Sequence, residues 1–478
     1  MTEHDITLAQ LNADQRHAYT TILHSINDGL KSLYFVQGPA GTGKTFLYKV
    51  LCSYFRSKGK IVLCVASSGI AALLLPGGRT SHSRFKIPIM IHETSTCAIS
   101  PNTLLGGLIK KTSLIIWDEV PMQHKYCFEA VNRTLNDICG AEDTALFGNI
   151  PIILGGDFAQ ILPVVRKGNR AATVTACLQR SILWSSITVL SLHQNMRVRE
   201  GEANLIFANW LRQLSYLPQH QGTISLPDFI PLCTTIDQLC AHVFPATIMR
   251  MAHSNPATFA RRAILAMRND TVAAINQKVL QEISGTEREY YSIDESESIG
   301  MESGENQLPV EYLHSLNPAS LPPSKLKLKI GAPVILLRNL YPKEGLCNGT
   351  RMTITRMERW CIEVQILGGQ FDGSSKILPR IKLSTTDGEL PFILTRKQFP
   401  IRLSFAMTVN KAQGQSLDTV GIDLPEPAFT HGQLYVALSR VTTLQGLKVL
   451  QLAGHGCATQ NIVYPEVLIQ GMFYFLYI

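Results

Sequence analysis

The sequence predicts an α/β fold with two α/β domains and a small β-rich module inserted in the second. Strand-like and helix-like segments alternate from about 33 to 190, short β-like runs broken by glycines fill 329–400, and α/β character then returns until about 452. Alternating strands and helices are typical of a parallel sheet, in which ligands bind at the carboxyl ends of the strands.

The predicted elements of the first domain follow its apolar runs. Strands are expected at LYFVQ, KIVLCVAS, SLIIWDE and IPIILGGD, and helices over 44–58 and 125–138. Residues 284–328 differ, because they combine Asp294 and several glutamates with serines and prolines and show no periodicity. We expect a long acidic surface loop there.

These patterns define the expected domain boundaries. They are 1–190 for the first domain, with a small wedge insertion near 86–112, then 191–283 together with 401–478 for the second domain, 284–328 for the acidic loop and 329–400 for the β-rich module.

The composition narrows the class of protein. The 478 residues carry a net charge of +8, a mild basic excess compatible with a polyanionic partner. Eleven cysteines are scattered without a C-x-x-C pair, which indicates neither a zinc site nor a disulfide framework and fits a reducing compartment. The polar N-terminus lacks the apolar core of a secretory signal, and the apolar tail 467–478 is shorter than the roughly 20 residues of a membrane-spanning helix. We expect no membrane association, and a tail that is a terminal strand or helix or an artefact of the gene model.

The stretch GPAGTGKT fits the phosphate-binding pattern G-x-x-x-x-G-K-[ST], follows an apolar run and precedes a helical pattern. Its glycines let backbone N–H groups close around phosphate oxygens, and the following helix points its positive end at the same anion. Lys44 is expected to reach the β- and γ-phosphates, and the Thr45 hydroxyl to bind Mg²⁺. A chance match in a glycine-rich turn is the alternative. The predicted nucleotide-binding residues of the loop are Gly38, Pro39, Ala40, Gly41, Thr42, Gly43, Lys44 and Thr45.

Carboxylates follow two further predicted strands. Asp118 and Glu119 end SLIIWDE, where the first carboxylate can support Mg²⁺ and the second can orient or activate water. Asp157 and Gln160 lie just beyond IPIILGG, and Gln160 is expected to sense the γ-phosphate or to position water. A surface turn is the alternative for both stretches.

These features indicate an NTPase without indicating what the hydrolysis drives, because many unrelated functions use this loop. A GTPase is disfavoured. The dipeptide Asn410-Lys411 is followed by Ala-Gln, so no aspartate is available there to recognise guanine.

The order of the motifs resembles the Pif-type (petite integration frequency) superfamily-one DNA helicases, and most closely their branch in Helitron transposons. The resemblance extends from about 11 to 450 and includes, in order, LNADQ, GPAGTGKT, ASSGIAALLLPGGRTSHSRF, DEVPM, GGDFAQILPV, LHQNMR, LKLKIGAPVILLRNL, GLCNGT, MTVNKAQGQSL and HGQLYVALSR. It implies two RecA-like P-loop NTPase domains with ATP in the cleft between them, and an SH3-like fold for the β-rich module.

The resemblance also implies roles at the nucleotide. Gln15 in LNADQ is similar to the family's adenine-reading glutamine, although the residues alone favour an exposed helix position. Arg197 in LHQNMR and Arg440 in HGQLYVALSR match arginines that reach the γ-phosphate from the second domain. From the pattern alone, the last motif is a short helix with an apolar stripe that places Gln433 and Arg440 together on another face, and a buried salt bridge is the alternative for Arg440.

Other matches imply contacts with DNA. Three positions in the first domain match a segment that contacts single-stranded DNA, although Phe85 could instead belong to the core. Gln413 and Gly414 lie where relatives couple DNA contact to nucleotide state. The expected DNA-binding residues are Thr80, His82, Phe85, Thr408, Asn410 and Lys411.

Two positions depart from the family pattern. Ala159 stands where many relatives carry arginine, which is expected to weaken an electrostatic contact, and Asn149 replaces a glycine. We recognise no replication-initiator nuclease domain of the kind that Helitron proteins carry, so we expect a stand-alone helicase module or a fragment.

The resemblance implies an ATP- and Mg²⁺-dependent monomer that translocates 5′ to 3′ on single-stranded DNA and unwinds tailed duplexes. It also implies roles in DNA repair, recombination and telomere maintenance, and residence in the nucleus, with the mitochondrion as a second possibility. A domesticated or decayed transposon ATPase that binds DNA without unwinding it, or an ATPase that remodels proteins, are the alternatives.

Overall fold

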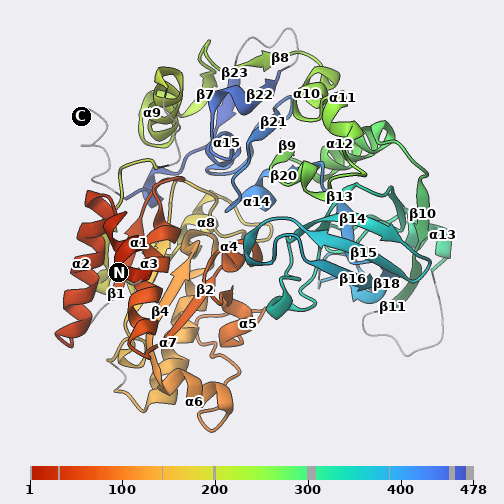
Figure 1. Ribbon diagram of the computed structural model, residues 1–478. Coiled ribbons are helices and arrows are strands. Elements are labelled where there is room, and N and C mark those ends of the chain that lie inside the picture. Colours follow the sequence, from red (N-terminus) through yellow and green to blue (C-terminus); the bar gives the residue numbers. More distant parts are fainter. Residues whose placement is uncertain are drawn as a thin grey trace.

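A computed structural model describes residues 3–30, 33–142, 144–196, 201–298, 308–386, 388–451 and 458–469. Figure 1 shows two α/β domains and a β-rich module beside them, in the order that the sequence predicts. The first domain holds the N-terminal part of the chain up to β6, and the second is completed by the C-terminal strands that follow the module.

A six-stranded parallel sheet in the order β3-β2-β4-β5-β1-β6 forms the first domain. Alternate residues of β4 enter two different cores, Trp117 on one face and Ile116 on the other, so both faces are buried, as expected of a parallel sheet. The strands are β1 (Leu33–Gln37), β2 (Ile61–Ala66), β3 (Arg79–Thr80), β4 (Thr112–Asp118), β5 (Ile152–Gly156) and β6 (Thr188–Ser191). The helices are α1 (Glu3–Ala9), α2 (Ala13–Asn27), α3 (Lys44–Ser57), α4 (Gly69–Leu74), α5 (Ser81–Phe85), α6 (Leu104–Lys110), α7 (Lys125–Cys139) and α8 (Arg170–Ala176).

The second domain contains a five-stranded parallel sheet in the order β20-β9-β21-β22-β8. Two of its strands precede the β-rich module in the chain and three follow it, so the module is an insertion. The strands are β8 (Leu232–Cys233), β9 (Arg262–Ala266), β20 (Ala406–Thr408), β21 (Thr419–Asp423) and β22 (Leu447–Leu450), with a separate antiparallel pair of β7 (Gly222–Ser225) and β23 (Ala458–Asn461). The helices are α9 (Glu202–Tyr216), α10 (Ile236–Val243), α11 (Ala246–Arg250), α12 (Asn269–Glu282), α14 (Val409–Ala412) and α15 (Gln433–Leu438).

The inserted module is rich in β-strands, as its short runs broken by glycines predict, and its strands pair antiparallel. A five-stranded sheet has the order β16-β15-β14-β13-β19, and a three-stranded sheet has the order β11-β18-β17. The bounds are β13 (Pro333–Leu336), β14 (Arg351–Met357), β15 (Cys361–Ile366), β16 (Ser375–Pro379), β17 (Ile381–Ser384), β18 (Phe392–Gln398) and β19 (Ile401–Leu403).

The prediction of one acidic surface loop over 284–328 is wrong. The segment contains β10 (Arg288–Tyr291), β11 (Ile293–Ser298), α13 (Val310–Ser315) and β12 (Lys325–Leu328), and residues 299–307 lie outside the described ranges. β10 pairs with β12, and β11 pairs with β18 of the module. The described part of the segment is therefore a structural part of the module.

One acidic residue of this segment, Asp294, forms a buried ion pair rather than a surface charge. Asp294 and Arg396 are both fully buried, with 2.6 Å between Oδ2 and Nη2. The Arg396 guanidinium also donates to the carbonyls of Leu313, Leu316 and Pro322. One arginine therefore joins β18, β11, α13 and the loop after it, because a buried guanidinium must find acceptors for its N–H groups.

The module also reaches the first domain. A Cβ atom on Gly69, at the start of α4, would lie 2.5 Å from the carbonyl oxygen of Asn348 in the GLCNGT turn. Only a residue without a side chain permits this approach of two backbones, so α4 and this turn are in direct contact.

Near the C-terminus, Pro465–Val467 form a short 3-10 turn rather than a strand or an α-helix. The Val467 side chain packs into the core of the first domain. Residues 470–478, most of the predicted terminal element, lie outside the described ranges. Within those ranges, no helix has the length and apolar character needed to cross a membrane.

Replacing Asp294 by Asn should destabilise the module by about 3–5 kcal/mol, because it leaves the buried Arg396 without its counter-charge. Urea denaturation, followed by tryptophan fluorescence, measures the loss in the free energy of unfolding. Glu295→Gln is the matched control on the same strand, since Glu295 pairs with Lys382 at 3.0 Å on the exposed surface, where a pair contributes about 0–1 kcal/mol. Equal stability of the two variants would contradict the role given to Asp294.

Candidate functional site

Three loops meet because the strands before them are neighbours in the first sheet. β4, β5 and β1 are adjacent and parallel, with Gln37 paired to Gly156 and Trp117 to Leu154. Their carboxyl ends bring the phosphate-binding loop, the Asp118-Glu119 pair and Asp157 to one edge, as the sequence predicts for a parallel sheet.

The phosphate-binding loop has its expected strand–loop–helix setting between β1 and α3. No side chain within the described residues caps the start of α3, so the N–H groups of its first turn and the positive end of its dipole face the loop. The Lys44 ammonium lies over the loop and donates to the carbonyls of Gly38 and Pro39. The Thr42 hydroxyl closes the turn by donating to the Pro39 carbonyl at 2.9 Å.

Asp118 and Glu119 are buried side by side at the end of β4. Burial, followed by the neighbouring charge of Glu119, raises the pKa of Asp118 to about 7, and Lys44 opposes this rise. Glu119 occupies the left-handed region with φ of 53°, and its N–H donates to Asp118 at 2.9 Å. A non-glycine residue in this conformation costs energy, and here the turn directs the Glu119 carboxylate back into the site.

A cavity of about 370 Å³ joins these groups, lined by Lys44, Thr45, Asp118 and Glu119 of the first domain and by Gly414 and Arg440 of the second. The Thr45 hydroxyl and the Asp118 carboxylate are oxygen ligands that suit Mg²⁺, and a cation beside Asp118 would offset the cost of its buried charge. Mg²⁺ in phosphate sites typically uses only one or two carboxylates, which agrees with the lack of any cluster of three His, Cys, Asp or Glu ligands among the described residues. The residues therefore fit a magnesium ion.

Gln160 lines the same cavity, and its amide orientation follows from its neighbour. Its Nε2 donates to the Asp157 carboxylate at 3.2 Å, and a carboxylate can only accept. The Oε1 atom is buried without a hydrogen-bond partner in the described structure. A buried acceptor of this kind suits a water proton better than a phosphate oxygen, which is itself an acceptor.

Tyr435 of α15 connects the two domains. Its hydroxyl donates to Asp157 at 3.0 Å and accepts the N–H of Ala40 in the phosphate-binding loop at 3.3 Å. Burial, reinforced by the charge of Asp157, raises the pKa of Tyr435 well above its usual value, so the hydroxyl keeps its proton. Sequence reasoning missed this residue, because nothing in the sequence around Tyr435 indicates a contact with the first domain.

A second bridge reaches the Glu119 carboxylate directly. Gln413 follows directly after α14 of the second domain, and its Nε2 donates to Glu119 at 3.0 Å. Gly414 follows in the wall of the cavity. The structure therefore brings both residues to the nucleotide site.

Arg440 lies where an arginine finger is expected, in the cavity with Lys44 and Glu119. Its guanidinium donates to the carbonyls of Val436 and Gln415 and to the Ser439 hydroxyl. Burial lowers the pKa of Arg440, which the charge of Glu119 partly opposes. Within the described ranges Arg440 forms no salt bridge, which was the alternative, and the role of Arg440 at the γ-phosphate stays a prediction.

The predicted face shared by Gln433 and Arg440 does not exist. α15 ends at Leu438, before Arg440, and all its residues are buried. The Gln433 side chain accepts the N–H of Phe429 at 2.9 Å instead of facing the nucleotide cavity. A helix enclosed on all sides has no polar face from which periodicity could be read.

Gln15 is buried rather than exposed. It forms a capping box with Asn12 at the start of α2, and its Nε2 donates to the Thr42 carbonyl at 3.0 Å. The residue lies against the phosphate-binding loop, and adenine recognition by Gln15 stays a prediction. Arg197 lies outside the described residues.

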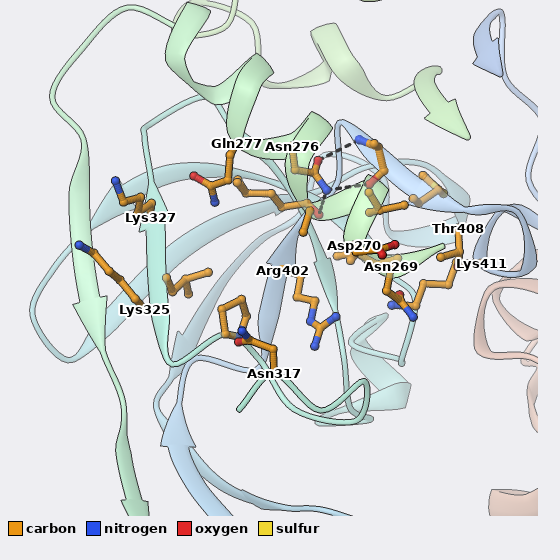
Figure 2. Close-up of a pocket in the computed structure, with 18 of the residues that line it drawn as sticks. Asn269, Asp270, Asn276, Gln277, Asn317, Lys325, Lys327, Arg402, Thr408 and Lys411 are labelled. Carbon is orange, nitrogen blue, oxygen red and sulfur yellow. Dashed lines mark hydrogen bonds between the residues drawn. The ribbon is translucent and has the colours of Figure 1, made fainter. Parts of the chain in front are cut away.

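A larger cavity of about 690 Å³ runs between α12 of the second domain and the module. Figure 2 shows basic side chains from three elements around it, together with the amides of Asn276 and Gln277 on α12. The cations are Lys325 and Lys327 of β12, Arg402 of β19 and Lys411 of α14. We call this cavity the basic groove.

The basic groove contains two of the predicted DNA-binding residues, Thr408 and Lys411. Burial, and then repulsion from Arg402, lowers the pKa of Lys411 to about 8, so an anion in the groove would favour its charged form. Lys325 and Lys327 were not singled out from the sequence. Their spacing of two residues in KLKLKIG puts them on one face of a strand, which is the signal that could have found them.

Of the other predicted DNA contacts, three keep positions compatible with DNA binding and one does not. Asn410 accepts from Gln433 at 3.4 Å, and Thr80 and His82 lie at the carboxyl edge of the first sheet, where Thr80 and Asp118 both pair with Ala66. The prediction that Phe85 contacts DNA is wrong, because its side chain is fully buried and its ring centroid lies 5.5 Å from that of Trp117. Phe85 is therefore a core residue and cannot stack on a base.

Both departures from the family pattern have structural explanations. Ala159 is buried among apolar residues of the second domain's core, where a small apolar residue fits, and the weakened electrostatic contact stays a prediction. Asn149 adopts φ of 61°, and asparagine is among the few residues that tolerate this region in place of glycine.

Comparisons with known proteins agree with this arrangement. The family model for PIF1-like helicases matches residues 10–219, and the model for the 2B domain of the DNA helicase Pif1 matches 311–357. The ATP-dependent DNA helicase Pif1 of Bdellovibrio bacteriovorus is 30% identical over 424 residues, which cover 87% of this chain and 83% of that protein. The human ATP-dependent DNA helicase PIF1 is 30% identical over 453 residues, 93% of this chain and 61% of that protein, so the chain spans about three fifths of its length.

Solved structures share the fold. The chain matches Bacteroides Pif1 bound to single-stranded DNA with a TM-score of 0.65 and 22% identity, over 98% of this chain and 96% of that one. Pif1 from Candida albicans matches with a TM-score of 0.64 and 22% identity, over 98% of each chain. These matches support two RecA-like domains with an inserted module.

The boundary between the domains should weaken in acid because of His431. Its Nδ1 accepts the N–H of Tyr464 and its Nε2 donates to the Phe158 carbonyl, so the buried ring is neutral. Burial lowers the pKa of His431 from 6.5 to about 4; Arg170 reinforces this, and the Phe158 hydrogen bond and Glu466 oppose it. A lowered folded-state pKa gives full stability above about 6.5 and a loss as the pH falls towards 4.

The expected loss is on the order of 3 kcal/mol between these two pH values. Urea unfolding at a series of pH values measures it, with His431→Gln as the control that can keep both hydrogen bonds without titrating. A pH dependence that is the same in both proteins would contradict the assignment to His431.

Proposed function

This chain belongs to the PIF1-like helicase family, and we propose that it is an ATP-dependent DNA helicase that translocates 5′ to 3′ on single-stranded DNA and unwinds tailed duplexes. The observation that supports the proposal best is the shared cavity, in which groups from both domains surround the phosphate-binding loop. A site built from two domains can convert nucleotide binding and hydrolysis into relative domain movement.

In this proposal the first domain performs the chemistry. The phosphate-binding loop and Lys44 hold the phosphates, and Mg²⁺, when bound at Thr45 and Asp118, neutralises developing charge. Glu119 and Gln160 orient the attacking water, Glu119 as its base and the Gln160 Oε1 as an acceptor. Arg440 supplies positive charge at the γ-phosphate from the second domain.

The basic groove is the proposed path of the DNA strand, with Thr408 and Lys411 as contacts. Gln413 follows directly after α14 and donates to Glu119, so a change at the groove can reach the hydrolytic carboxylate through one side chain. Separating one base pair costs a mean of roughly 1.4 kcal/mol, which is small against ATP hydrolysis. Action as a monomer and residence in the nucleus are parts of this proposal that rest on the family alone.

The direct experiment measures ATP hydrolysis with and without single-stranded DNA, and unwinding of duplexes with a 5′ or a 3′ tail. We expect DNA to stimulate hydrolysis and only the 5′-tailed duplex to be unwound. Lys44→Ala is the blank, and Arg440→Ala is expected to bind ATP but not to hydrolyse it. Hydrolysis without DNA stimulation would refute the proposal, and DNA-stimulated hydrolysis without unwinding would favour a decayed ATPase that only binds DNA.

A further inference from the structure

A second basic and aromatic surface lies on the module, outside the basic groove. A cavity of about 450 Å³ there is lined by Arg288, Tyr291, Ile293, Arg359, Trp360 and Arg380, together with Glu289 and Tyr290. β10, which carries Tyr291, lies at the outer edge of the module in Figure 1. We call this the Trp360 surface.

The Trp360 surface exposes large flat side chains. Trp360 is 59% exposed in the turn between β14 and β15, and Tyr291 and Ile293 are each 54% exposed. The other tryptophans, Trp117, Trp184 and Trp210, are buried or partly buried in the two α/β domains. An exposed tryptophan beside two other exposed apolar residues forms a patch that favours a binding site.

The turn that carries Trp360 is held in place rather than free. The Tyr290 hydroxyl donates to the Glu358 carbonyl at 2.9 Å, and the Arg288 guanidinium donates to the Met357 carbonyl. Arg380 donates to the Tyr291 carbonyl at 2.7 Å. These bonds present the aromatic and basic groups as one preformed surface.

The charge of the surface is positive. Glu289 is neutralised by Lys325 at 2.9 Å and by Lys327 at 3.4 Å, and Glu358 by Arg356. Arg288, Arg359 and Arg380 form no ion pair with any carboxylate in the described part of the chain. An anionic ligand would satisfy these groups.

The arginines and aromatic rings are also arranged for stacking. The Arg359 guanidinium lies 5.0 Å from the centre of the Trp360 ring, and that of Arg380 lies 5.9 Å from the same ring. Aromatic faces and guanidinium planes both stack on unpaired bases, while the remaining N–H groups bind phosphates. This combination matches single-stranded nucleic acid better than an acidic protein, which would use the charges but not the exposed rings.

Lys325 connects the two sites. It lines the basic groove, and its ammonium lies 5.4 Å from the centre of the Tyr291 ring on the Trp360 surface. A strand that leaves the groove past Lys325 therefore meets Tyr291 first and Trp360 beyond it.

We propose that the Trp360 surface is an extension of the DNA-binding site, on which Tyr291 and Trp360 stack unpaired bases of the strand that leaves the basic groove while Arg359 and Arg380 hold its phosphates. The inference rests on the proposed function, because it extends the path of the same strand. It enlarges the number of nucleotides that the protein contacts without adding sequence specificity, because every base has a flat face.

The test is the affinity for oligothymidylates in a length series from about 4 to about 16 nucleotides, the range of site sizes of comparable stacking surfaces. We expect Trp360→Ala to lose about tenfold in affinity for the longest oligonucleotides, since one stacked base is worth roughly that factor, and nothing for the shortest. Trp360→Phe should keep most of the affinity, because phenylalanine also stacks. Tyr341→Ala is the matched control, an aromatic residue of the module that is 64% exposed and lines neither cavity.

Two further readouts separate direct contact from an indirect effect. Long oligonucleotides should quench tryptophan fluorescence in the wild-type protein and not in Trp360→Phe. Arg359→Ala should reduce the slope of affinity against salt by about 0.7 for each phosphate that the variant no longer neutralises, and only for long oligonucleotides. Trp360→Ala that binds the whole series like the wild type would overturn the inference, even if DNA still stimulates ATP hydrolysis. Lack of any DNA stimulation in the wild type would overturn the proposed function and this inference together.

Discussion

The hydrogen bond from the Gln413 amide to the Glu119 carboxylate crosses the boundary between the two parallel sheets at the reactive edge of the first. Glu119 follows β4 and itself adopts the left-handed conformation. Gln413 follows the short helix α14, whose Lys411 lines the basic groove. The position of the Glu119 carboxylate thus depends on the second domain. One buried side chain separates the groove from the nucleotide site, so coupling between the two needs no long chain of intermediates.

Several polar and charged groups are buried at the same boundary, and burying such groups costs free energy unless they are paired. Asp157 accepts hydrogen bonds from Gln37, Gln160 and Tyr435, and Arg440 lies near it with its charge unpaired by any described carboxylate. Burial strengthens every electrostatic interaction in this cavity, at the cost of raising the pKa of Asp118. Such a set of buried polar groups lowers stability unless each group is paired or shared with a ligand.

The parts of this structure that sequence reasoning predicted are those with local signals. The phosphate-binding loop and the Asp118-Glu119 pair each lie within a few residues of a recognisable strand, and their meeting follows from parallel topology. Other features depend on partners far away in the chain. Asp294 looked like a surface charge because Arg396 is about a hundred residues away. Phe85 was assigned to DNA by its match to a family segment, and its packing on Trp117 of β4 leaves no local signal in the sequence. Tyr435 carries no local signal at all, since its role exists only where α15 meets the first domain.

If the Gln413–Glu119 hydrogen bond transmits DNA binding to ATP hydrolysis, its removal should uncouple the two. The most direct measurement is the ratio of ATP hydrolysis rates with saturating single-stranded DNA and without DNA, compared between the wild type and Gln413→Ala. The Gln413 Oε1 has no partner in the described structure, so the substitution removes only the bond to Glu119. We expect the ratio to fall close to one while the affinity for DNA is kept. A folded Gln413→Ala variant with the wild-type ratio would contradict this role of the hydrogen bond.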